Sequence, residues 1–130
     1  MKLWISLYVI VWLAFLEFVL VWAPVSSIAP LVYAHVFLGT IIFALAYSNS
    51  SKLRRTDCPA RIKRIVKATV GLAAFEGLLG IVLVVSKMGL LPDLITSAVD
   101  FLHLGAALAI VTQAASVATA YDMWEEREFA

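Results

Sequence analysis

The sequence predicts an all-α integral membrane protein, a four-helix bundle built from two antiparallel hairpins. Three observations lead to this fold class. Hydrophobic residues make up 63% of the 130-residue chain, whereas soluble domains are usually about 45–50% apolar. These residues fall into four long runs, each long enough for a helix that crosses a bilayer. Seven of the ten Lys and Arg residues lie in residues 48–67, between the second run and the start of the third.

The four predicted spans cover about residues 3–23, 31–47, 66–86 and 94–120 and form a single domain. A helix that rises about 1.5 Å per residue needs about 20 residues to cross a ~30 Å hydrocarbon core. The first span is too long for the apolar part of a signal peptide, and Glu17 interrupts it. We therefore interpret it as a membrane span that the protein keeps.

The connections between the spans predict the orientation of the chain. Two prolines bracket the short connection at residues 24–30, so the second span returns beside the first. The basic segment at residues 48–67 is typical of a cytoplasmic loop, since Lys and Arg are enriched on that side. Both termini are then cytoplasmic, and the chain is a multi-pass protein of the cell membrane. A net charge of +1 argues against a nucleic-acid partner, and Cys58 alone can form no intrachain disulfide.

Five ionisable residues lie well inside the predicted spans: Glu17, His35, Glu76, Asp100 and His103. Charged groups in hydrocarbon are costly, so we expect each acid to be protonated or paired. Asp100 and His103 are three residues apart and share one face of a helix. Each predicted hairpin has a Glu on its first helix and a His on its second, which indicates a weak internal repeat.

The depth of these residues follows from the helical rise. Glu17 and His35 are expected about 8–9 Å below the outer helix ends, and Glu76 and His103 about 15 Å below theirs. All four are therefore predicted in the outer leaflet or near the middle of the membrane. Gln113 lies toward the other side of the fourth span, where we expect it to donate an interhelical hydrogen bond.

Two histidines facing one bundle core are the ligands that a single b-type haem needs. We therefore take His35 and His103 as candidate metal ligands, with Gly39 and Gly105 letting helices approach closely beside them. Three alternatives stay open. The acids and histidines also fit a carboxylate-bridged di-metal bundle, although only one acid-x-x-His motif occurs. They also fit a proton or cation path, or polar contacts that only order the bundle.

Three short segments resemble half of a haem A synthase, a membrane enzyme that oxidises haem O for cytochrome oxidase assembly. They are residues 33–39 (YAHVFLG), 75–82 (FEGLLGIV) and 102–107 (LHLGAA). In that family a Gln-Gly-Leu-Leu-Gly-like stretch precedes a helix whose His binds haem in a Leu-His-Leu-Leu-Ala context. The family usually has eight helices in two four-helix halves, and its compact four-helix forms are thought to assemble as oligomers.

The chain departs from the family at two points. The catalytic Glu-x-x-His-Arg of the family is absent, because Val32 and Val36 stand at those flanks of His35. The outer loop with paired cysteines is also missing. The resemblance implies an oxidoreductase with haem O or haem A as substrate or product, and Glu17, Asp100 and Glu76 are then the candidate catalytic acids.

Two further functions stay open beside that one. The first is a membrane cytochrome b that takes electrons from quinol. The second is a non-enzymatic assembly factor or transport subunit. We expect membrane lipid, haem and a quinone or redox protein as partners, and a homo-oligomer as the assembled state.

Overall fold

Four helices account for nearly all of the structure, a computed structural model that describes residues 2–22 and 29–128. No strand occurs in these two ranges, so the predicted all-α class is confirmed. In chain order the helices are α1 (Leu3–Trp22), α2 (Ala29–Leu53), α3 (Ala60–Lys87) and α4 (Asp93–Glu128).

Each of the four helices is long and apolar enough to cross a membrane, as judged from length and composition. The shortest, α1, has 20 residues, and a helix of that length spans about 30 Å, the thickness of a hydrocarbon core. The described chain is therefore compatible with the predicted multi-pass membrane protein. Most of the predicted connection at residues 24–30 lies outside the described residues.

Three helices run further than their apolar runs predict, and the basic segment is mostly helical. Helix α2 continues beyond residue 47 to Leu53, and α3 begins at Ala60 rather than residue 66. The extension of α2 carries Asn49, which is fully buried, so this turn packs inside the bundle although its residues are polar. Apolarity predicts where a helix lies in lipid, whereas the helix itself ends where backbone hydrogen bonding stops. Helix α4 likewise continues past residue 120 to Glu128.

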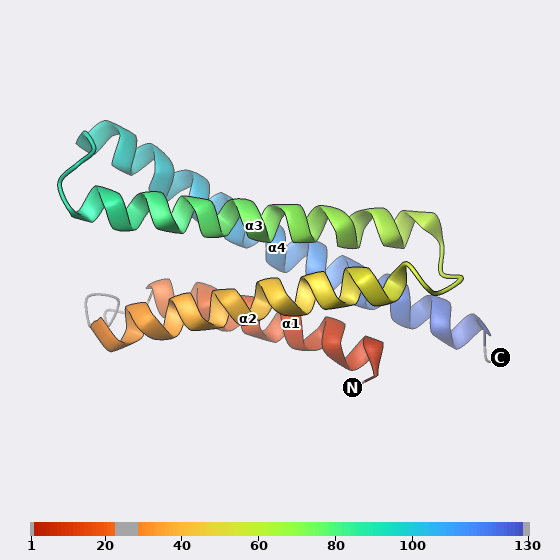
Figure 1. Cartoon of the computed structure of the whole chain (residues 1–130). Helices are drawn as coiled ribbons and strands as arrows, with labels where there is room; N and C mark the ends of the chain where they lie inside the picture. Colours follow the sequence, from red (N-terminus) through yellow and green to blue (C-terminus); the bar gives the residue numbers. More distant parts are fainter. Residues whose placement is uncertain (1, 23–28, 129–130) are drawn as a thin grey trace.

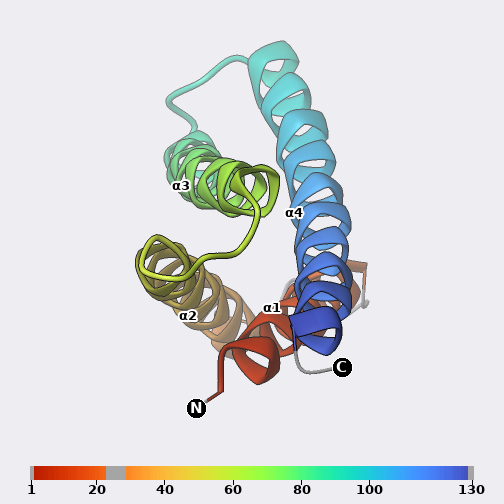
Figure 2. The ribbon, with the colours of Figure 1, turned by 90° about the vertical axis from the view of Figure 1, so that its right-hand side faces the viewer.

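The four helices form a closed ring in which each packs on the next and α4 packs back on α1. Helices α1 and α3 are therefore diagonal neighbours, as are α2 and α4 (Figure 2). Both chain termini lie at one end, which we call the terminal end, and the turn between α3 and α4 lies at the far end (Figure 1). The α1–α2 pair and the α3–α4 pair are close at the terminal end and separate toward the far end (Figures 1 and 2).

Buried apolar side chains form two clusters, which lie in the terminal and middle parts of the bundle. The terminal cluster consists of Leu7, Leu53, Cys58, Ile62, Val66, Val117, Ala118 and Tyr121. The middle cluster consists of Ile10, Ala14, Ile42, Ala46, Ala73, Ile110 and Ala114. Small residues in the middle cluster let helix backbones approach closely. No third buried apolar cluster occurs among the described residues of the far half.

The buried positions of α1 and α2 recur in α3 and α4 with the same spacing. Ala14 lies three residues before Glu17, and Ala73 lies three residues before Glu76. These two alanines belong to the same middle cluster although 59 residues separate them in sequence (14 against 73). The first helix of each pair therefore places an alanine and a glutamate, three residues apart, at equivalent positions in the bundle.

The second helices repeat in the same way. Ile42 lies seven residues after His35, and Ile110 lies seven residues after His103. Because α1 is diagonal to α3 and α2 to α4, the buried positions are related by an approximate two-fold axis along the bundle. Further buried pairs in this register are Leu7 and Val66, Ile10 and Thr69, Ala46 and Ala114, Asn49 and Val117, and Leu53 and Tyr121.

Candidate functional site

One ionisable residue from each helix contributes to two carboxylate–imidazole pairs. Oε2 of Glu17 on α1 forms an ion-pair contact with Nδ1 of His35 on α2. Oε1 of Glu76 on α3 lies 3.1 Å from Nδ1 of His103 on α4. The structure thus brings together each Glu and His that the sequence places on successive helices. The pairs are counterparts under the approximate two-fold axis.

The two histidines meet across the centre of the bundle. Their ring centroids lie 6.0 Å apart and their planes cross at 79°. They come from α2 and α4, which are diagonal, so the imidazoles span the centre of the ring of helices. Imidazole nitrogens bind a metal ion at about 2 Å, so two imidazoles on opposite sides of one ion have centroids roughly 6 Å apart. The observed separation matches that of two ligands of one metal.

The apparent difference in depth between the two pairs comes from unequal helix lengths. Glu17 lies five residues before the end of α1, whereas Glu76 lies eleven residues before the end of α3. Since the two imidazoles are in contact, both pairs lie at one level of the bundle. The α3–α4 pair simply extends about 8–9 Å further at the far end.

Glu17 is the most buried of the four side chains and His35 is the most exposed. The side chain of Glu17 is 10% exposed and that of His35 is 33% exposed, whereas Glu76 and His103 are nearly equal at 17% and 16%. Neither carboxylate contact has the geometry of an aligned hydrogen bond, and both oxygens of Glu17 are buried. Buried charges require a partner to offset their lost hydration. Three of the four side chains therefore lie largely inside the bundle, and the imidazole of His35 is the most accessible group of the site.

The glycine that approaches a histidine is not one of the two that the sequence indicated. A Cβ atom added to Gly39 or Gly105 would meet nothing within 4 Å, so the close helix approach predicted there is absent. A Cβ added to Gly80 would lie 3.6 Å from Cε1 of His103. Gly80 belongs to the helix that packs against α4, which sequence spacing alone could not reveal.

Asp100 lies apart from the two pairs. Its side chain is exposed, and it makes no ion pair or hydrogen bond with any residue in the described ranges. In the register of the repeat its counterpart is Val32, so this acid is not a repeated feature. Although Asp100 and His103 are one helical turn apart, the structure does not bring their side chains into contact.

Within residues 2–22 and 29–128, no three His, Cys, Asp or Glu side chains gather where they could hold a metal ion. A carboxylate-bridged di-metal centre uses ligands from all four helices in one cluster.

Two polar residues in the terminal half were missed or misread in the sequence. Asn49 was assigned to a polar loop, whereas it lies in α2 and is fully buried. Gln113 was expected to donate an interhelical hydrogen bond, but its Oε1 accepts one from Thr69 Oγ1 at 3.1 Å. The buried positions of the repeat would have placed Asn49 opposite Val117, but that register is visible only in the structure.

Comparison of the chain with protein-family models, with curated proteins and with solved structures finds no match. The resemblance to haem A synthase rests on the three short segments around His35, Glu76 and His103.

Proposed function

We propose that this chain is a membrane haem protein that holds one b-type haem between His35 and His103 and transfers electrons through it. The observation that carries the proposal is the 6.0 Å separation of the two ring centroids. It agrees with the roughly 6 Å expected for two imidazoles on one metal. Both rings also come from helices related by the two-fold repeat, which suits two equivalent axial ligands.

Each glutamate supports its histidine as a ligand. A carboxylate at Nδ1 favours the tautomer with a proton on that nitrogen and the lone pair on Nε2. It also fixes the orientation of the ring and makes the imidazole a stronger donor. Glu17 and Glu76 would thus orient the ligands and, as charges near the iron, tune its reduction potential.

The far half of the bundle offers apolar surface for a porphyrin. The helix pairs separate there (Figure 1), and Leu79 on α3 is a buried apolar side chain about one turn beyond Glu76. Haem supplies a one-electron Fe(III)/Fe(II) couple when two axial ligands hold the iron. If both His35 and His103 held the iron, no position on it would be open to a substrate, which favours electron transfer over chemistry at this iron. Quinol or a redox protein would then be the electron donor.

Oxidation of a haem substrate, as in haem A synthase, is the second candidate because of the resemblance around His35 and His103. Glu17, Glu76 and Asp100 are the candidate catalytic acids in that case. Coexpression with a haem O producer distinguishes the two roles, since a synthase should yield haem I or haem A on extraction. Recovery of unchanged haem O would favour the electron carrier.

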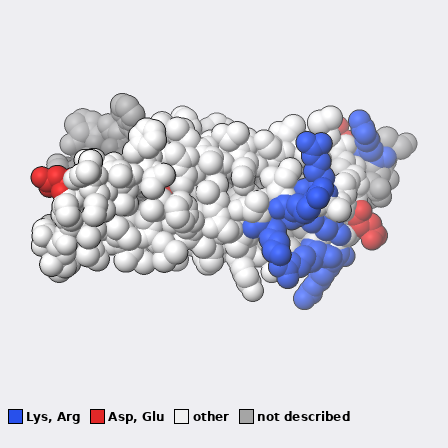
Figure 3. All heavy atoms as spheres, turned by 90° about the horizontal axis from the view of Figure 1, so that it is seen from above, with Lys and Arg blue, Asp and Glu red and all other residues white. Residues whose placement is uncertain are grey.

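We further propose that the helix pairs are antiparallel hairpins with both termini in the cytoplasm, and that copies associate in the membrane. The support is the distribution of basic residues, which gather toward the terminal end (Figure 3). Cytoplasmic segments are enriched in Lys and Arg, and such residues also attract anionic lipid headgroups. These residues are Lys52, Arg54, Arg55, Arg61, Lys63, Arg64 and Lys67.

The direct test is spectroscopic. The protein is purified in detergent, incubated with haemin, and its oxidised and dithionite-reduced absorption spectra are recorded. Bis-histidine haem should give a sharp low-spin α-band in the reduced spectrum. A colourless protein that cannot be reconstituted would refute haem binding and favour a non-enzymatic assembly or transport role.

Replacement of a supporting carboxylate should weaken haem binding without removing a ligand. We expect Glu76→Gln and Glu17→Gln each to lower haem affinity about 10–100-fold, as is usual when the outer partner of a ligating His is changed. Haemin titration followed at the Soret band measures the change. Asp122→Asn is the control, because Asp122 accepts a hydrogen bond from Tyr8 near the terminal end and should leave haem affinity unchanged.

A further inference from the structure

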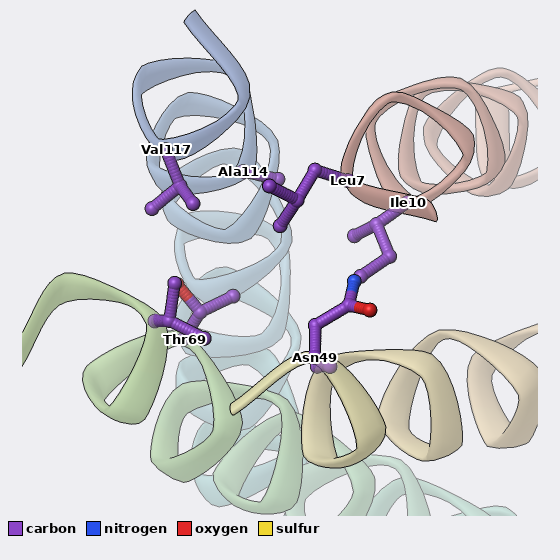
Figure 4. A pocket seen from close by; sticks show the side chains of 8 residues that line it. Leu7, Ile10, Asn49, Thr69, Ala114 and Val117 are labelled. Carbon is purple, nitrogen blue, oxygen red and sulfur yellow. The ribbon is translucent and has the colours of Figure 1, made fainter. Parts of the chain in front are cut away.

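A small cavity lies in the terminal half of the bundle, with all four helices contributing to its wall (Figure 4). Its volume is about 10 Å³, measured as the space open to the centre of a water molecule. Its walls are apolar except for Asn49 on α2 and Thr69 on α3. Their apolar counterparts in the repeat, Val117 and Ile10, also line it, so the cavity lies on the approximate two-fold axis.

Asn49 is the unusual member of this wall. Asn49 is 0% exposed, and neither its Nδ2 nor its Oδ1 has a hydrogen-bond partner. A buried amide without partners destabilises a fold, and native structures satisfy nearly all such groups with protein atoms or ordered water. The amide group extends from α2 toward the other side chains that line the cavity (Figure 4). Asn49 therefore needs a partner that the protein chain does not supply.

Thr69 provides a second polar atom at the same cavity. Its Oγ1 lies 3.0 Å from the carbonyl oxygen of Ile65 and 3.1 Å from Oε1 of Gln113, so these two acceptors share its single proton. A hydroxyl oxygen can also accept, so Oγ1 retains capacity for a donor from the cavity. Thr69 thus already connects α3 to Gln113 on α4.

We propose that this cavity binds one water molecule that donates hydrogen bonds to Oδ1 of Asn49 and Oγ1 of Thr69. The volume is at the lower limit for a single water, and two polar partners are the minimum that holds one. A metal cation would need about six oxygen ligands, which this wall cannot provide. The water completes a polar chain from Asn49 through Thr69 to Gln113 and so links α2, α3 and α4.

The water site is separate from the carboxylate–imidazole pairs. Ala14 and Ala73 lie between the cavity level and the two glutamates, and both are buried in the middle cluster. The proposal therefore does not depend on haem binding. The water links the two helix pairs in the terminal half of the bundle, where these pairs are close together.

The sequence allows a direct experiment, because Asn49 is the only asparagine in the chain. The full chain is labelled with ¹⁵N in asparagine only and reconstituted in deuterated lipid vesicles. Solid-state NMR with magnetisation selected from water should give a cross-peak to the Asn49 side-chain amide protons. Absence of this cross-peak in the unmodified protein means a dry cavity and overturns the proposal.

Two variants test the position of the water. Thr69→Val removes the second partner at nearly constant shape, and Ala114→Val fills the cavity, so each should abolish the cross-peak. Thr40→Val and Ala74→Val make the same changes at exposed positions and should preserve it. A cross-peak that survives in both cavity variants would show that water reaches Asn49 by another route. That result would also overturn the proposal of one water shared by Asn49 and Thr69.

Discussion

Replacement of His103 by alanine is expected to abolish the low-spin α-band of the reduced protein, and replacement of His35 should do the same. The two rings are the only imidazoles in the chain, and each would supply one of the two axial ligands. A single variant should retain haem in a high-spin form with weaker affinity, whereas the double variant should lose it. Absorption spectra of haemin-reconstituted protein measure these changes.

Two controls show whether the loss is specific to the ligands. Free imidazole added to His103→Ala should restore the low-spin band, because it can replace the missing ring in the space that the side chain left. Asp100→Asn should keep the band, since Asp100 is exposed and contacts neither pair. Persistence of an unchanged band in either histidine variant would show that another residue binds the iron.

Overpacking of the middle cluster should destabilise the bundle equally in its two repeated halves. Ala14→Leu and Ala73→Leu each add three carbons at a buried position where small side chains allow the helices to approach. We expect each change to reduce the free energy of unfolding by about 1–3 kcal/mol, the usual cost of inserting methylene groups into a packed core. Loss of helical circular dichroism on titration with SDS measures this free energy.

The control for these two substitutions is at residue 74, next to Ala73. Ala74→Leu makes the same addition on the exposed side of α3 and should change stability by less than about 0.5 kcal/mol. Similar costs at residues 14 and 73 are the result expected from the repeat. A large cost at only one of them would mean that the two halves pack differently and would weaken the argument for two equivalent ligands.

The repeat gives the candidate site its approximate two-fold symmetry. Residues without a matching counterpart in the repeat lie outside the two carboxylate–imidazole pairs. Glu17 and His35 have counterparts in Glu76 and His103, and the four meet at one level of the bundle. Asp100 corresponds to Val32 and remains outside the site. Asn49 corresponds to Val117, so the water cavity has a polar wall on one side of the axis only.

The number of helices and the identity of the ionisable residues follow from the sequence alone. Apolar runs long enough for a bilayer are read directly, because the length of a spanning helix depends only on rise per residue and membrane thickness. The order of Glu17, His35, Glu76 and His103 along the chain is equally visible, since acids and imidazoles are rare in hydrocarbon. These observations predicted the fold class and the candidate ligands.

Contacts between helices were decided only by the tertiary structure. Periodicity places a side chain on a face of its own helix, but the rotation of that helix against its neighbours depends on how all four pack. For this reason the sequence assigned close approach to Gly39 and Gly105, whereas Gly80 is the glycine beside His103. For the same reason, spacing placed Asp100 and His103 on one face of a helix, but only the packing of α4 showed that the acid is exposed whereas the imidazole meets His35.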